Sequence, residues 1–286
     1  MKKIAVIINP KAGSNNKKLL KEVLEKLSDS NQLTIFETSK PGDATEIAKK
    51  ECSNFDLVAV AGGDGTIHEV INGINEVTPL AIIPTGTANI VAIESGISKN
   101  VENICMTINQ GKTKKAFIHK INNKKFILMV GVGYDGAVVK NINLTQKKIF
   151  GKFIFVVEAI KQFLKLPQFN ISIETNNTIY KGNWILITNT KNYAGPFKIT
   201  KLTNIFDESL VCYVFHKLNK LNFLYNLFLI IVLGDLSKSK NITTLKSSAF
   251  KINSKIPIPI QCDGEKLDQF PAIIKTEKQF VNLLVP

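Results

Sequence analysis

The 286-residue sequence is long enough to bury a sizeable core, and its length favours two modest domains. Hydrophobic residues make up 44% and charged residues 21%, which excludes a disordered or fibrous chain. The net charge of +14 favours anionic partners, although abundant Lys, Asn and Ile from genomic base composition would explain it equally well.

Nucleotide phosphates and anionic lipid headgroups both fit this positive charge. No aromatic-basic RNA-binding pattern and no zinc-finger spacing occurs, so nucleic acid is not expected as a partner. The four cysteines include no C-x-x-C pair, so neither a zinc site nor a disulfide framework is expected. The apolar run at 4–8 is too short for a signal-peptide core, and the run at 221–233 falls short of the ~20 residues that span a bilayer. We therefore expect a cytoplasmic protein, peripherally associated with the inner face of the membrane.

The first 110 residues alternate short β-branched runs with longer helical patterns, which predicts β-α-β units and a parallel sheet. The run Leu57–Ala61 is apolar throughout, as expected of a strand covered by helices on both faces. Strands are expected at 4–8, 33–36, 57–61 and 80–83, and helices near 16–28, 43–51 and 66–74.

After Gly111 the pattern changes to strands separated by turn signals, beginning with a hairpin around Asn122-Asn123. This half is expected to be mainly antiparallel, so we predict two domains, 1–115 and 116–286. Its strands are expected at 116–121, 125–130, 169–174, 179–188, 209–215, 248–253, 256–261 and 280–285, and its helices near 147–165 and 219–233.

The strongest motif is Gly62-Gly-Asp-Gly-Thr66, which directly follows a buried strand and precedes a helix expected from about Ile67. Glycines there let the backbone turn sharply and bring N–H groups close to an anion, and the helix N-terminus adds partial positive charge. Asp64 among such amides would be repulsive unless it holds Mg²⁺ or a reacting hydroxyl, so it indicates chemistry as well as phosphate binding. The plainer interpretation is a tight turn with Asp64 as the helix N-cap.

Two more turns follow parallel strands of this half, Asn9-Pro-Lys-Ala-Gly13 and Pro84-Thr-Gly-Thr-Ala-Asn89. Ligands in open α/β sheets bind outside the carboxyl ends of the strands, so one nucleotide could touch all three loops. Taken alone, the Asn-Pro-x-x-Gly loop is equally well explained as an ordinary Pro-Gly turn.

These three motifs, in this order and at these intervals, closely resemble the diacylglycerol kinase catalytic domain. That family includes soluble bacterial lipid kinases and the sphingosine and ceramide kinases. The resemblance covers nearly the whole chain. It continues through Thr38 with Gly42-Asp-Ala44, Gly131-Val-Gly-Tyr-Asp135, Tyr193-Ala-Gly195 and Asp263-Gly-Glu265.

The resemblance implies an α/β domain with a parallel sheet, similar to NAD kinase and diacylglycerol kinase, then a mainly antiparallel β-sandwich domain, with the active site between them. It implies ATP and Mg²⁺ as cofactors, with Asp64 near the metal or nucleotide. Glu265 matches the proton acceptor from the lipid hydroxyl, with Asp263 beside it, although the triplet alone would be interpreted as a hairpin turn. The implied nucleotide contacts are Asn9, Pro10, Lys11, Ala12, Gly13, Thr38, Gly62, Gly63, Asp64, Gly65, Thr66, Ile67, His68, Thr87 and Asn89.

The family also implies a structural Mg²⁺ in the second domain, held by Asp207 with the backbone carbonyls of Asn204 and Ser209. The family usually continues Asp-Gly-x-Leu-Asp, whereas this chain has Glu208 and Val211 at the glycine and second acid. Many members also have Asp where this chain has Ile90.

Three other signals are given lesser weight. The spacing Gly131-x-Gly-x-x-Gly136 matches a dinucleotide fingerprint, but it lies in the antiparallel half and no acid ends a second parallel strand. His68, His119 and His216 show no metal-ligand spacing, although His68 could help fix the phosphate loop. The stretch 147–165 combines Lys and Phe; a core-packed helix with lysines reaching solvent is favoured over a lipid-binding face.

The expected function is ATP-dependent phosphorylation of a lipid hydroxyl at the membrane surface, with diacylglycerol as the first choice of substrate and phosphatidic acid as its product. An NAD kinase is the second possibility, and a weakly active lipid or nucleotide sensor the third. The sequence leaves open which lipid is used and whether the protein is a monomer or a homodimer.

Overall fold

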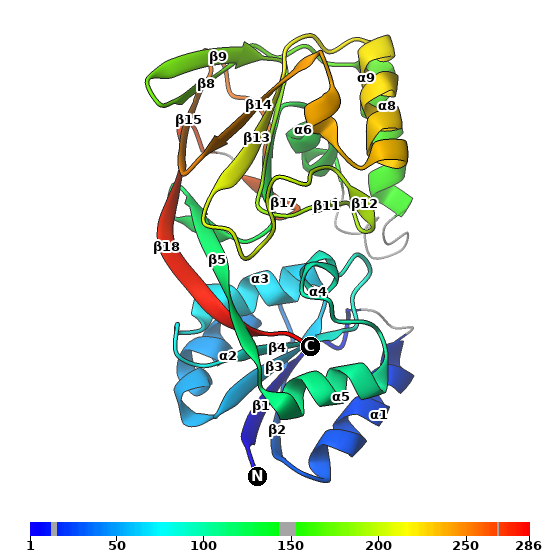
Figure 1. The fold of residues 1–286 in the computed structure, drawn as a ribbon, viewed down its shortest axis with the longest axis vertical. Helices are drawn as coiled ribbons and strands as arrows, with labels where there is room; N and C mark the ends of the chain where they lie inside the picture. The colour runs from blue at the N-terminus through cyan, green and yellow to red at the C-terminus, as the bar shows by residue number, and fades with distance from the viewer. Residues whose placement is uncertain (13–15, 143–152, 268) are drawn as a thin grey trace. The chain divides into compact units, whose positions relative to one another are not determined.

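The protein, described by a computed structural model over residues 1–12, 16–142, 153–267 and 269–286, divides into two compact units (Figure 1). Unit 1 consists of Met1–Ile118, Ala194–Pro196 and Lys278–Pro286, and unit 2 of His119–Tyr193 and Phe197–Glu277. The main division lies close to the predicted boundary at 115/116. The last residues of the chain, however, which the prediction assigned to the second domain, belong to unit 1.

Unit 1 is an α/β unit whose central strands are almost completely buried, because helices cover both faces of the sheet, whereas the edge strand Gln32–Glu37 is partly exposed. Its strands are β1 (Lys3–Ile8), β2 (Gln32–Glu37), β3 (Leu57–Gly62) and β4 (Leu80–Pro84). Its helices are α1 (Lys17–Ser28), α2 (Asp43–Glu51), the short η2 (Cys52–Asn54), α3 (Asp64–Gly73), α4 (Ile90–Glu94) and α5 (Val101–Gln110).

The strands of this sheet lie in the order β2-β1-β3-β4, followed by the C-terminal end of β18 (Ala272–Leu284), and they pair in parallel. The chain therefore reverses its direction across the sheet after β2. Right-handed crossovers then put α1 on one face and α2 and α3 on the other, as Figure 1 shows. Helix α5 packs against α1, and α2 packs against α3.

Unit 2 is mainly antiparallel. Its strands include the end of β5 (Thr113–Ile121), β6 (Lys124–Phe126), β7 (Met129–Val132), β8 (Ile171–Thr175), β9 (Thr178–Gly182), β10 (Trp184–Thr188), β11 (Asn192–Tyr193), β12 (Phe197–Lys198), β13 (Leu210–Phe215), β14 (Ile242–Ser247), β15 (Ala249–Asn253), β16 (Ile260–Cys262), β17 (Glu265–Leu267) and the start of β18. Its helices are α6 (Tyr134–Lys140), α8 (Phe153–Lys165), α9 (Lys220–Phe228), η3 (Leu229–Leu233) and η4 (Leu236–Lys238).

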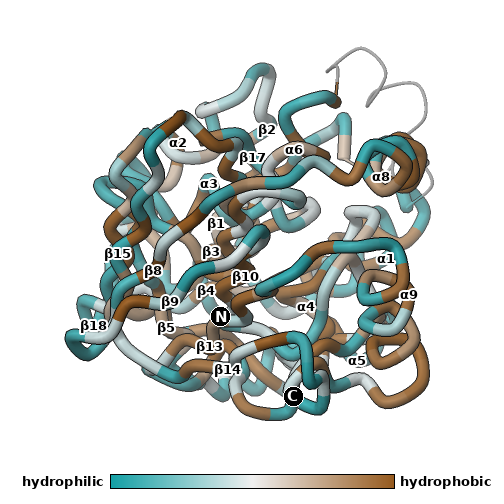
Figure 2. The backbone as a smooth tube through the Cα atoms, turned by 90° about the horizontal axis from the view of Figure 1, so that it is seen from above, coloured by the Kyte–Doolittle hydropathy of each residue, from teal (hydrophilic) through white to brown (hydrophobic). Residues whose placement is uncertain are grey.

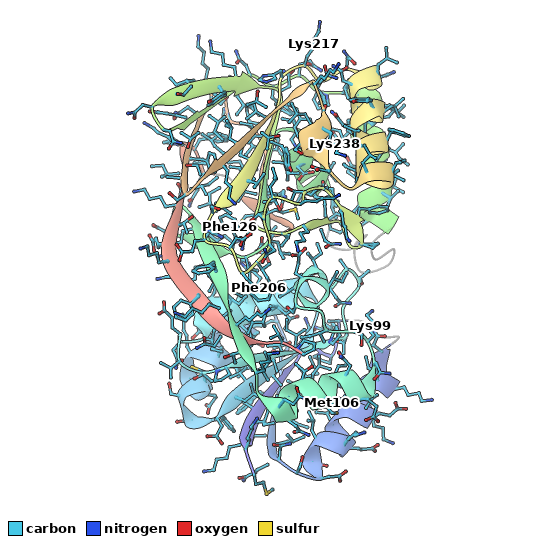
Figure 3. The ribbon with its side chains drawn as sticks, viewed as in Figure 1. Lys99, Met106, Phe126, Phe206, Lys217 and Lys238 are labelled. Atoms are coloured by element: carbon cyan, nitrogen blue, oxygen red, sulfur yellow. The ribbon has the colours of Figure 1, made fainter. Side chains whose placement is uncertain are left out.

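Two sheets of unit 2 share one hydrophobic core. One has the strand order β14-β13-β10-β7-β16-β17, and the other joins β18, β15, β8 and β9. Ile185, Val214 and Ile260 from the first sheet pack with Ile173 and Phe250 from the second, and all of them are buried. Phe126 lies in this same core (Figure 3). The predicted fold class, a parallel α/β unit followed by an antiparallel β-sandwich, is confirmed.

Several elements were not predicted, among them α4, α5, α6, β11, β12, β14 and β17. Helix α5 carried a recognisable signal, because the Asn100 side chain accepts a hydrogen bond from the Asn103 amide and Gly111 closes the helix in a left-handed conformation. The predicted strand at 256–261 is largely a loop, and only its last residues belong to β16. Helix α3 begins earlier than predicted, so Asp64 is its first residue. No helix in the described part of the chain has the length and apolar character needed to cross a bilayer.

Candidate functional site

Three loops of unit 1 leave neighbouring strands where the parallel sheet reverses its order. The reversal lies between β1 and β3, whose carboxyl ends lead into Asn9 and Gly63, and β4 beside β3 leads into Thr85. Ligands in open α/β sheets bind in the crevice outside the strand ends at such a switch point. The three predicted loops therefore come to one edge of the sheet, at the position expected for a ligand.

Hydrogen bonds join these loops to one another. The Asn9 amide donates to the carbonyl of Ala61 at 3.0 Å, and its side-chain Nδ2 donates to Thr66 Oγ1 at 3.1 Å. The Gly86 amide donates to the carbonyl of Gly62 at 3.2 Å. These bonds tie the loops after β1 and β4 to the end of β3 and the first turn of α3, so the three motifs form one structural unit.

Two glycines of this unit are required by close backbone approach. A Cβ added to Gly86 would lie 2.2 Å from the Cα of Gly63, and one added to Gly63 would lie 3.1 Å from the Cα of Gly86. Gly65 differs, because a Cβ there would meet no atom within 4 Å. Packing explains the first two glycines but not Gly65, whose missing side chain leaves open space beside the first turn of α3.

Helix α3 starts directly at this edge. Its N-cap is Gly63, which has no side chain to accept hydrogen bonds from the first-turn amides. The first four N–H groups of a helix have no partner within the helix, and the helix dipole adds partial positive charge there. The start of α3 is therefore suited to an anion such as phosphate.

Asp64 connects this helix to the third loop. Its Oδ1 accepts a hydrogen bond from the Val91 amide at 3.0 Å, at the start of α4. The preceding residue, Asn89, has a left-handed backbone with φ of 51°. Asp64 is therefore not the N-cap of α3, as the plainer sequence interpretation would have it, but a first-turn residue that fixes the neighbouring loop.

Two buried polar atoms in the third loop have no hydrogen-bond partner in the described part of the chain, Thr85 Oγ1 and Asn89 Oδ1. The Asn89 side chain does donate, from Nδ2 to the carbonyl of Gly86 at 2.8 Å. A buried polar atom without a partner costs free energy, on the order of 1–3 kcal/mol. Such atoms beside a glycine loop are suited to a polar ligand or a bound water.

Basic and hydroxyl side chains surround the same edge. Lys99 Nζ donates to the carbonyl of Gly86 at 3.3 Å (Figure 3), and Lys11 Nζ donates to the carbonyl of Ser39 at 2.8 Å. The Thr38 amide donates to the carbonyl of Ile8 at 2.9 Å. Two lysines thus lie within reach of the loops, and Lys99 was not among the predicted site residues.

The remaining predicted nucleotide residues of unit 1 differ in exposure. Pro10 and Thr87 are exposed and Ala12 is half-buried, whereas Ile67 and His68 are buried within α3. Gly13 lies outside the described residues. The side chains of Ile67 and His68 therefore belong to the core beneath the loop.

The second predicted cluster lies in unit 2, at the turn between β16 and β17. Asp263 and Gly264 both have left-handed backbones, with φ of 48° and 79°, and Cys262 pairs with Glu265 across the hairpin. Two consecutive positive φ values are typical of the tight turns that join antiparallel strands. The hairpin expected from the sequence is present.

Asp263 anchors this turn. Its Oδ2 accepts from the Ile127 amide, and its Oδ1 accepts from the amides of Leu128 and Met129, all at 2.9 Å. These three amides belong to the segment that leads from β6 into β7. Because backbone amides already engage both carboxylate oxygens, Asp263 is placed to hold the turn, whereas the neighbouring Glu265 is half exposed.

Glu265 forms an ion pair with Lys124. Its Oε2 lies 2.7 Å from Lys124 Nζ, and the side chains are 50% and 29% exposed. Burial lowers the pKa of Lys124, but the hydrogen bond and negative charge of Glu265 outweigh this, so its pKa lies above the ordinary value. Lys124 was not predicted, and it sets the charge environment of the proposed proton acceptor.

A buried polar network links this turn to two other motifs. The Gly264 amide donates to Gln261 Oε1 at 2.8 Å, Gln261 Nε2 donates to Asp135 Oδ2 at 3.2 Å, and the Tyr193 hydroxyl donates to Asp135 Oδ1. Burial raises the pKa of Asp135, and the hydrogen bonds from Tyr193 and Gln261 offset part of that rise. No local pattern indicates Gln261, because Asp135, which accepts the hydrogen bond from its Nε2, lies 126 residues away.

The glycine fingerprint that starts at Gly131 serves this network. A Cβ on Gly131 would lie 2.4 Å from Asp135 Oδ2, and one on Gly136 would lie 2.0 Å from the carbonyl of Pro259. Strand β7, which precedes α6, pairs antiparallel with β10 and β16. These glycines let α6 pack closely on the sheet, in agreement with the rejection of a dinucleotide fold.

The predicted structural metal loop is held by its own hydrogen bonds. Asp207 Oδ2 accepts from the Asn204 amide at 3.1 Å and from its Nδ2 at 2.9 Å, and the carbonyl of Asn204 accepts from the Asp207 amide at 2.9 Å. The carbonyl of Ser209 accepts from Thr203 Oγ1 at 3.1 Å. Within the described ranges no group of three His, Cys, Asp or Glu side chains is placed to hold a metal, but the predicted site relies on one carboxylate and two carbonyls and is not tested by this. The magnesium ion stays a prediction.

Family comparisons cover both units. Residues 3–143 match the family model of the diacylglycerol kinase catalytic domain, and residues 128–285 match that of the YegS C-terminal NAD kinase beta sandwich-like domain. A protein of Streptococcus pneumoniae named "putative lipid kinase" is 30% identical, covering 99% of this chain and 98% of its own length. A diacylglycerol kinase of Staphylococcus epidermidis is 27% identical over 100% of this chain and 92% of its own.

Solved structures share the fold. The crystal structure of a diacylglycerol kinase from Bacillus anthracis superposes with a TM-score of 0.77 at 22% identity, covering 99% of this chain and 97% of that one. An NAD kinase from Archaeoglobus fulgidus, crystallised with ATP, gives a TM-score of 0.57 at 11% identity, covering 98% and 93%. At these identities the likeness concerns the fold alone.

Proposed function

The chain belongs to the diacylglycerol kinase family, and from this premise we propose that it transfers the γ-phosphoryl group of ATP to a lipid hydroxyl. We propose diacylglycerol as the acceptor and phosphatidic acid, a precursor in phospholipid biosynthesis, as the product. The observation that carries the proposal is the glycine-lined edge of unit 1, where three loops meet at the switch point of a parallel sheet.

That edge fits the phosphates of a nucleotide. The open space at Gly65, the start of α3 and the unpartnered acceptor of Asn89 lie within connected loops. Lys11 and Lys99 add positive charge beside these loops, which favours a highly charged triphosphate. A phosphoryl transfer depends mainly on positioning and charge neutralisation, so this combination suits it.

Asp64 fits a role in holding Mg²⁺. Oxygen ligands from carboxylates are those that Mg²⁺ prefers, and the ion is typically bound by one or two carboxylates plus substrate phosphates. Bound Mg²⁺ would neutralise phosphate charge. The hydrogen bond from Val91 to Asp64 Oδ1 orients the carboxylate at the edge of the loops.

In unit 2 we propose Glu265 as the proton acceptor from the lipid hydroxyl. Lys124 Nζ lies 2.7 Å from its Oε2 and holds the side chain in place, and a carboxylate within reach of the hydroxyl orients the attacking oxygen. Asp263 acts as a positioning residue, because three backbone amides hold its carboxylate in the turn. Asp135 and Gln261 support that turn from below through the Gly264 amide.

A substrate-panel assay tests the proposal. Purified protein is incubated with ATP, Mg²⁺ and, separately, diacylglycerol, monoacylglycerol, ceramide, sphingosine and NAD, and products are identified by mass spectrometry. We expect phosphatidic acid from diacylglycerol and no product with the Asp64→Asn variant. NADP as the product would favour the NAD kinase alternative, which the match to an NAD kinase-like sandwich domain supports. Nucleotide binding without any product would indicate a sensor.

A further inference from the structure

Two helical segments of unit 2 lie side by side, α8 and the continuous run of α9 and η3 (Figure 1). The rings of Phe163 in α8 and Phe223 in α9 pack with their centroids 5.0 Å apart, and Phe223 in turn packs against Trp184 of the sheet. The inner side of α8 buries Ile154, Glu158 and Gln162, and the helix packs against α6.

The outer side of the same two segments is apolar. We call the following exposed residues the apolar helix face: Val156, Val157, Ile160, Leu164, Leu221, Leu224, Tyr225, Leu227, Phe228, Ile231, Val232 and Leu233. They include more than half of the large hydrophobic side chains that the described chain exposes, and Leu221 alone is 80% exposed. Hydrophobic segments of the chain in this region are brown in Figure 2.

The sequence spacing of these exposed residues shows that several of them share one side of a helix. Leu221, Leu224, Phe228 and Ile231 recur at intervals of three and four residues, which places them along one side of a helix. A helix with an apolar side normally buries that side against another element. Here α8 packs on α6 and α9, and α9 packs on Trp184 of the sheet, so the described part of the chain leaves the apolar helix face without a partner.

In α8 and the region 217–240, the exposed charged side chains are all positive. The two acids of these segments, Glu158 and Asp235, are buried. Glu158 accepts from Gln162 Nε2 at 2.7 Å and pairs with Lys161 Nζ at 3.6 Å, and Asp235 caps η4 through the Ser237 amide at 3.0 Å. The exposed lysines of α8 and of the region 217–240 are Lys161, Lys165, Lys217, Lys220, Lys238 and Lys240, of which Lys217 and Lys238 are labelled in Figure 3.

We propose that the apolar helix face docks the protein onto the surface of an anionic lipid bilayer, with its apolar side chains at the acyl boundary and the lysines at the lipid phosphates. Helices that combine an apolar side with exposed lysines and no exposed acid lie in membrane interfaces in this way. The inference rests on the proposed function, because a kinase for a bilayer lipid must reach its substrate at the membrane.

A second copy of the chain fits the face less well. A symmetric dimer would bring the lysines of one copy close to those of the other, and like charges that meet in an interface repel. An anionic bilayer instead supplies opposite charge to all six lysines at once.

The first test measures binding to vesicles without nucleotide or substrate. Vesicles of phosphatidylcholine containing 30% phosphatidylglycerol, chosen as the anionic lipid, are sedimented with wild-type protein, Ile231→Glu and Ile179→Glu. Ile231 and Ile179 are 61% and 63% exposed, and both figures place β9, which carries Ile179, away from α9. We expect Ile231→Glu to weaken binding at least about tenfold and Ile179→Glu to bind like wild type. Equal binding by all three proteins would overturn the proposal.

A second measurement reports contact directly and does not depend on a disruptive variant. Phe228→Trp places an indole on the apolar helix face, while the one native tryptophan, Trp184, is buried. Brominated phosphatidylcholine in the same vesicles should quench the added fluorescence and leave that of Trp184 nearly unchanged. Absence of quenching in sedimented protein would show that another surface binds the membrane.

The charge contribution is tested with Lys161→Gln, Lys165→Gln and Lys220→Gln combined. We expect binding to anionic vesicles to fall by about 100-fold and to lose much of its salt dependence, since each lysine near the surface contributes about 1 kcal/mol. Light scattering of wild type and Ile231→Glu reports the mass in solution. A dimer that Ile231→Glu converts to a monomer, with vesicle binding unchanged, would assign the face to self-association and overturn the proposal.

Failure of the kinase proposal remains distinguishable from failure of docking. Wild-type turnover with a short-chain diacylglycerol below its critical micelle concentration requires no membrane, and vesicle binding without ATP requires no turnover. Turnover without vesicle binding would refute docking alone. Vesicle binding without turnover on any lipid would refute the kinase assignment and leave docking supported.

Discussion

The proposed nucleotide edge of unit 1, formed by the loops after β1, β3 and β4, and the proposed acceptor turn of unit 2, at Asp263–Glu265, are built in opposite ways. In unit 1, backbone approach dominates: Gly86 leaves no room for a Cβ and Gly63 very little, and among the described residues of the three loops Asp64 is the one carboxylate. In unit 2, side chains dominate: Asp263 and Gln261 hold the turn through hydrogen bonds. Activity that depends on the first site should therefore be most sensitive to substitutions that add a side chain at a glycine. Activity that depends on the second should be most sensitive to substitutions that remove a hydrogen bond.

The difference agrees with what each site would hold under the proposed function. Phosphate oxygens are bound well by backbone amides, which need glycine to come close. A proton acceptor needs one carboxylate in a fixed position, and rigid positioning of a side chain requires supporting hydrogen bonds. The predictions below test this contrast between a site made by the backbone and a site made by side chains.

The largest effect is expected when the carboxylates themselves are neutralised. Asp64→Asn keeps an oxygen for the Val91 amide but removes the negative charge, so we expect kcat to fall by at least about 1,000-fold. Glu265→Gln should lower kcat about 100-fold, because a loose transition state depends less on a general base. Steady-state turnover with ATP and diacylglycerol measures both. Equal losses, or a larger loss for Glu265→Gln, would contradict the ranking.

A buried imidazole makes unit 2 sensitive to acid. His119 is fully buried, its Nδ1 lies 3.1 Å from Thr276 Oγ1, and desolvation lowers its pKa to about 4. Between about pH 6.5 and 4 the unfolded chain binds the proton that the folded chain excludes, so the free energy of unfolding falls as pH is lowered. We expect His119 to account for a loss of about 3 kcal/mol over this range.

Urea unfolding of wild type and His119→Gln at pH 7 and pH 4.5 checks this expectation. The variant should lose less stability than wild type on acidification, because it has no proton to take up at this position. His216→Gln, at an exposed histidine, is the matched control and should follow wild type. Parallel pH dependence of wild type and His119→Gln would contradict the assignment.

Adding a single methyl group at Gly86 should disrupt the packing of the loops at the strand ends of unit 1. Gly86→Ala places a Cβ 2.2 Å from the Cα of Gly63, and backbone atoms cannot yield as a flexible side chain can. We expect a loss of about 2–3 kcal/mol in stability, measured by urea unfolding, together with loss of ATP binding by calorimetry.

Gly65→Ala is the informative control for that variant. Its Cβ meets no atom within 4 Å, and alanine is favoured over glycine within a helix by about 1 kcal/mol, so stability should be unchanged or raised. If phosphate occupies the open space beside Gly65, ATP affinity should still fall. A stable Gly65→Ala variant with wild-type ATP affinity would place the phosphates elsewhere.

The same contrast decides how much the sequence could predict. The loops of unit 1 are local signals, since each glycine motif stands directly between a strand and a helix. The hairpin turn at Asp263 was also predictable, because its signal is local. The side chains that support it could not be predicted, because Lys124 lies 141 residues from Glu265 and Asp135 lies 126 residues from Gln261. Residues 278–286 likewise join unit 1 through β18 pairing beside β4, which no local pattern reports.

The smallest of these effects is expected at Gln261, which touches no predicted substrate group. Gln261→Leu removes the acceptor of the Gly264 amide and one donor to Asp135, so we expect a loss of about 1–2 kcal/mol in stability. Because Gly264 precedes Glu265, a positioning role predicts that kcat falls about tenfold while KM for ATP is unchanged. Gln269→Leu, at an exposed glutamine of the same unit, is the matched control and should change neither. Lost stability with wild-type kcat would show that the network holds the fold without positioning Glu265.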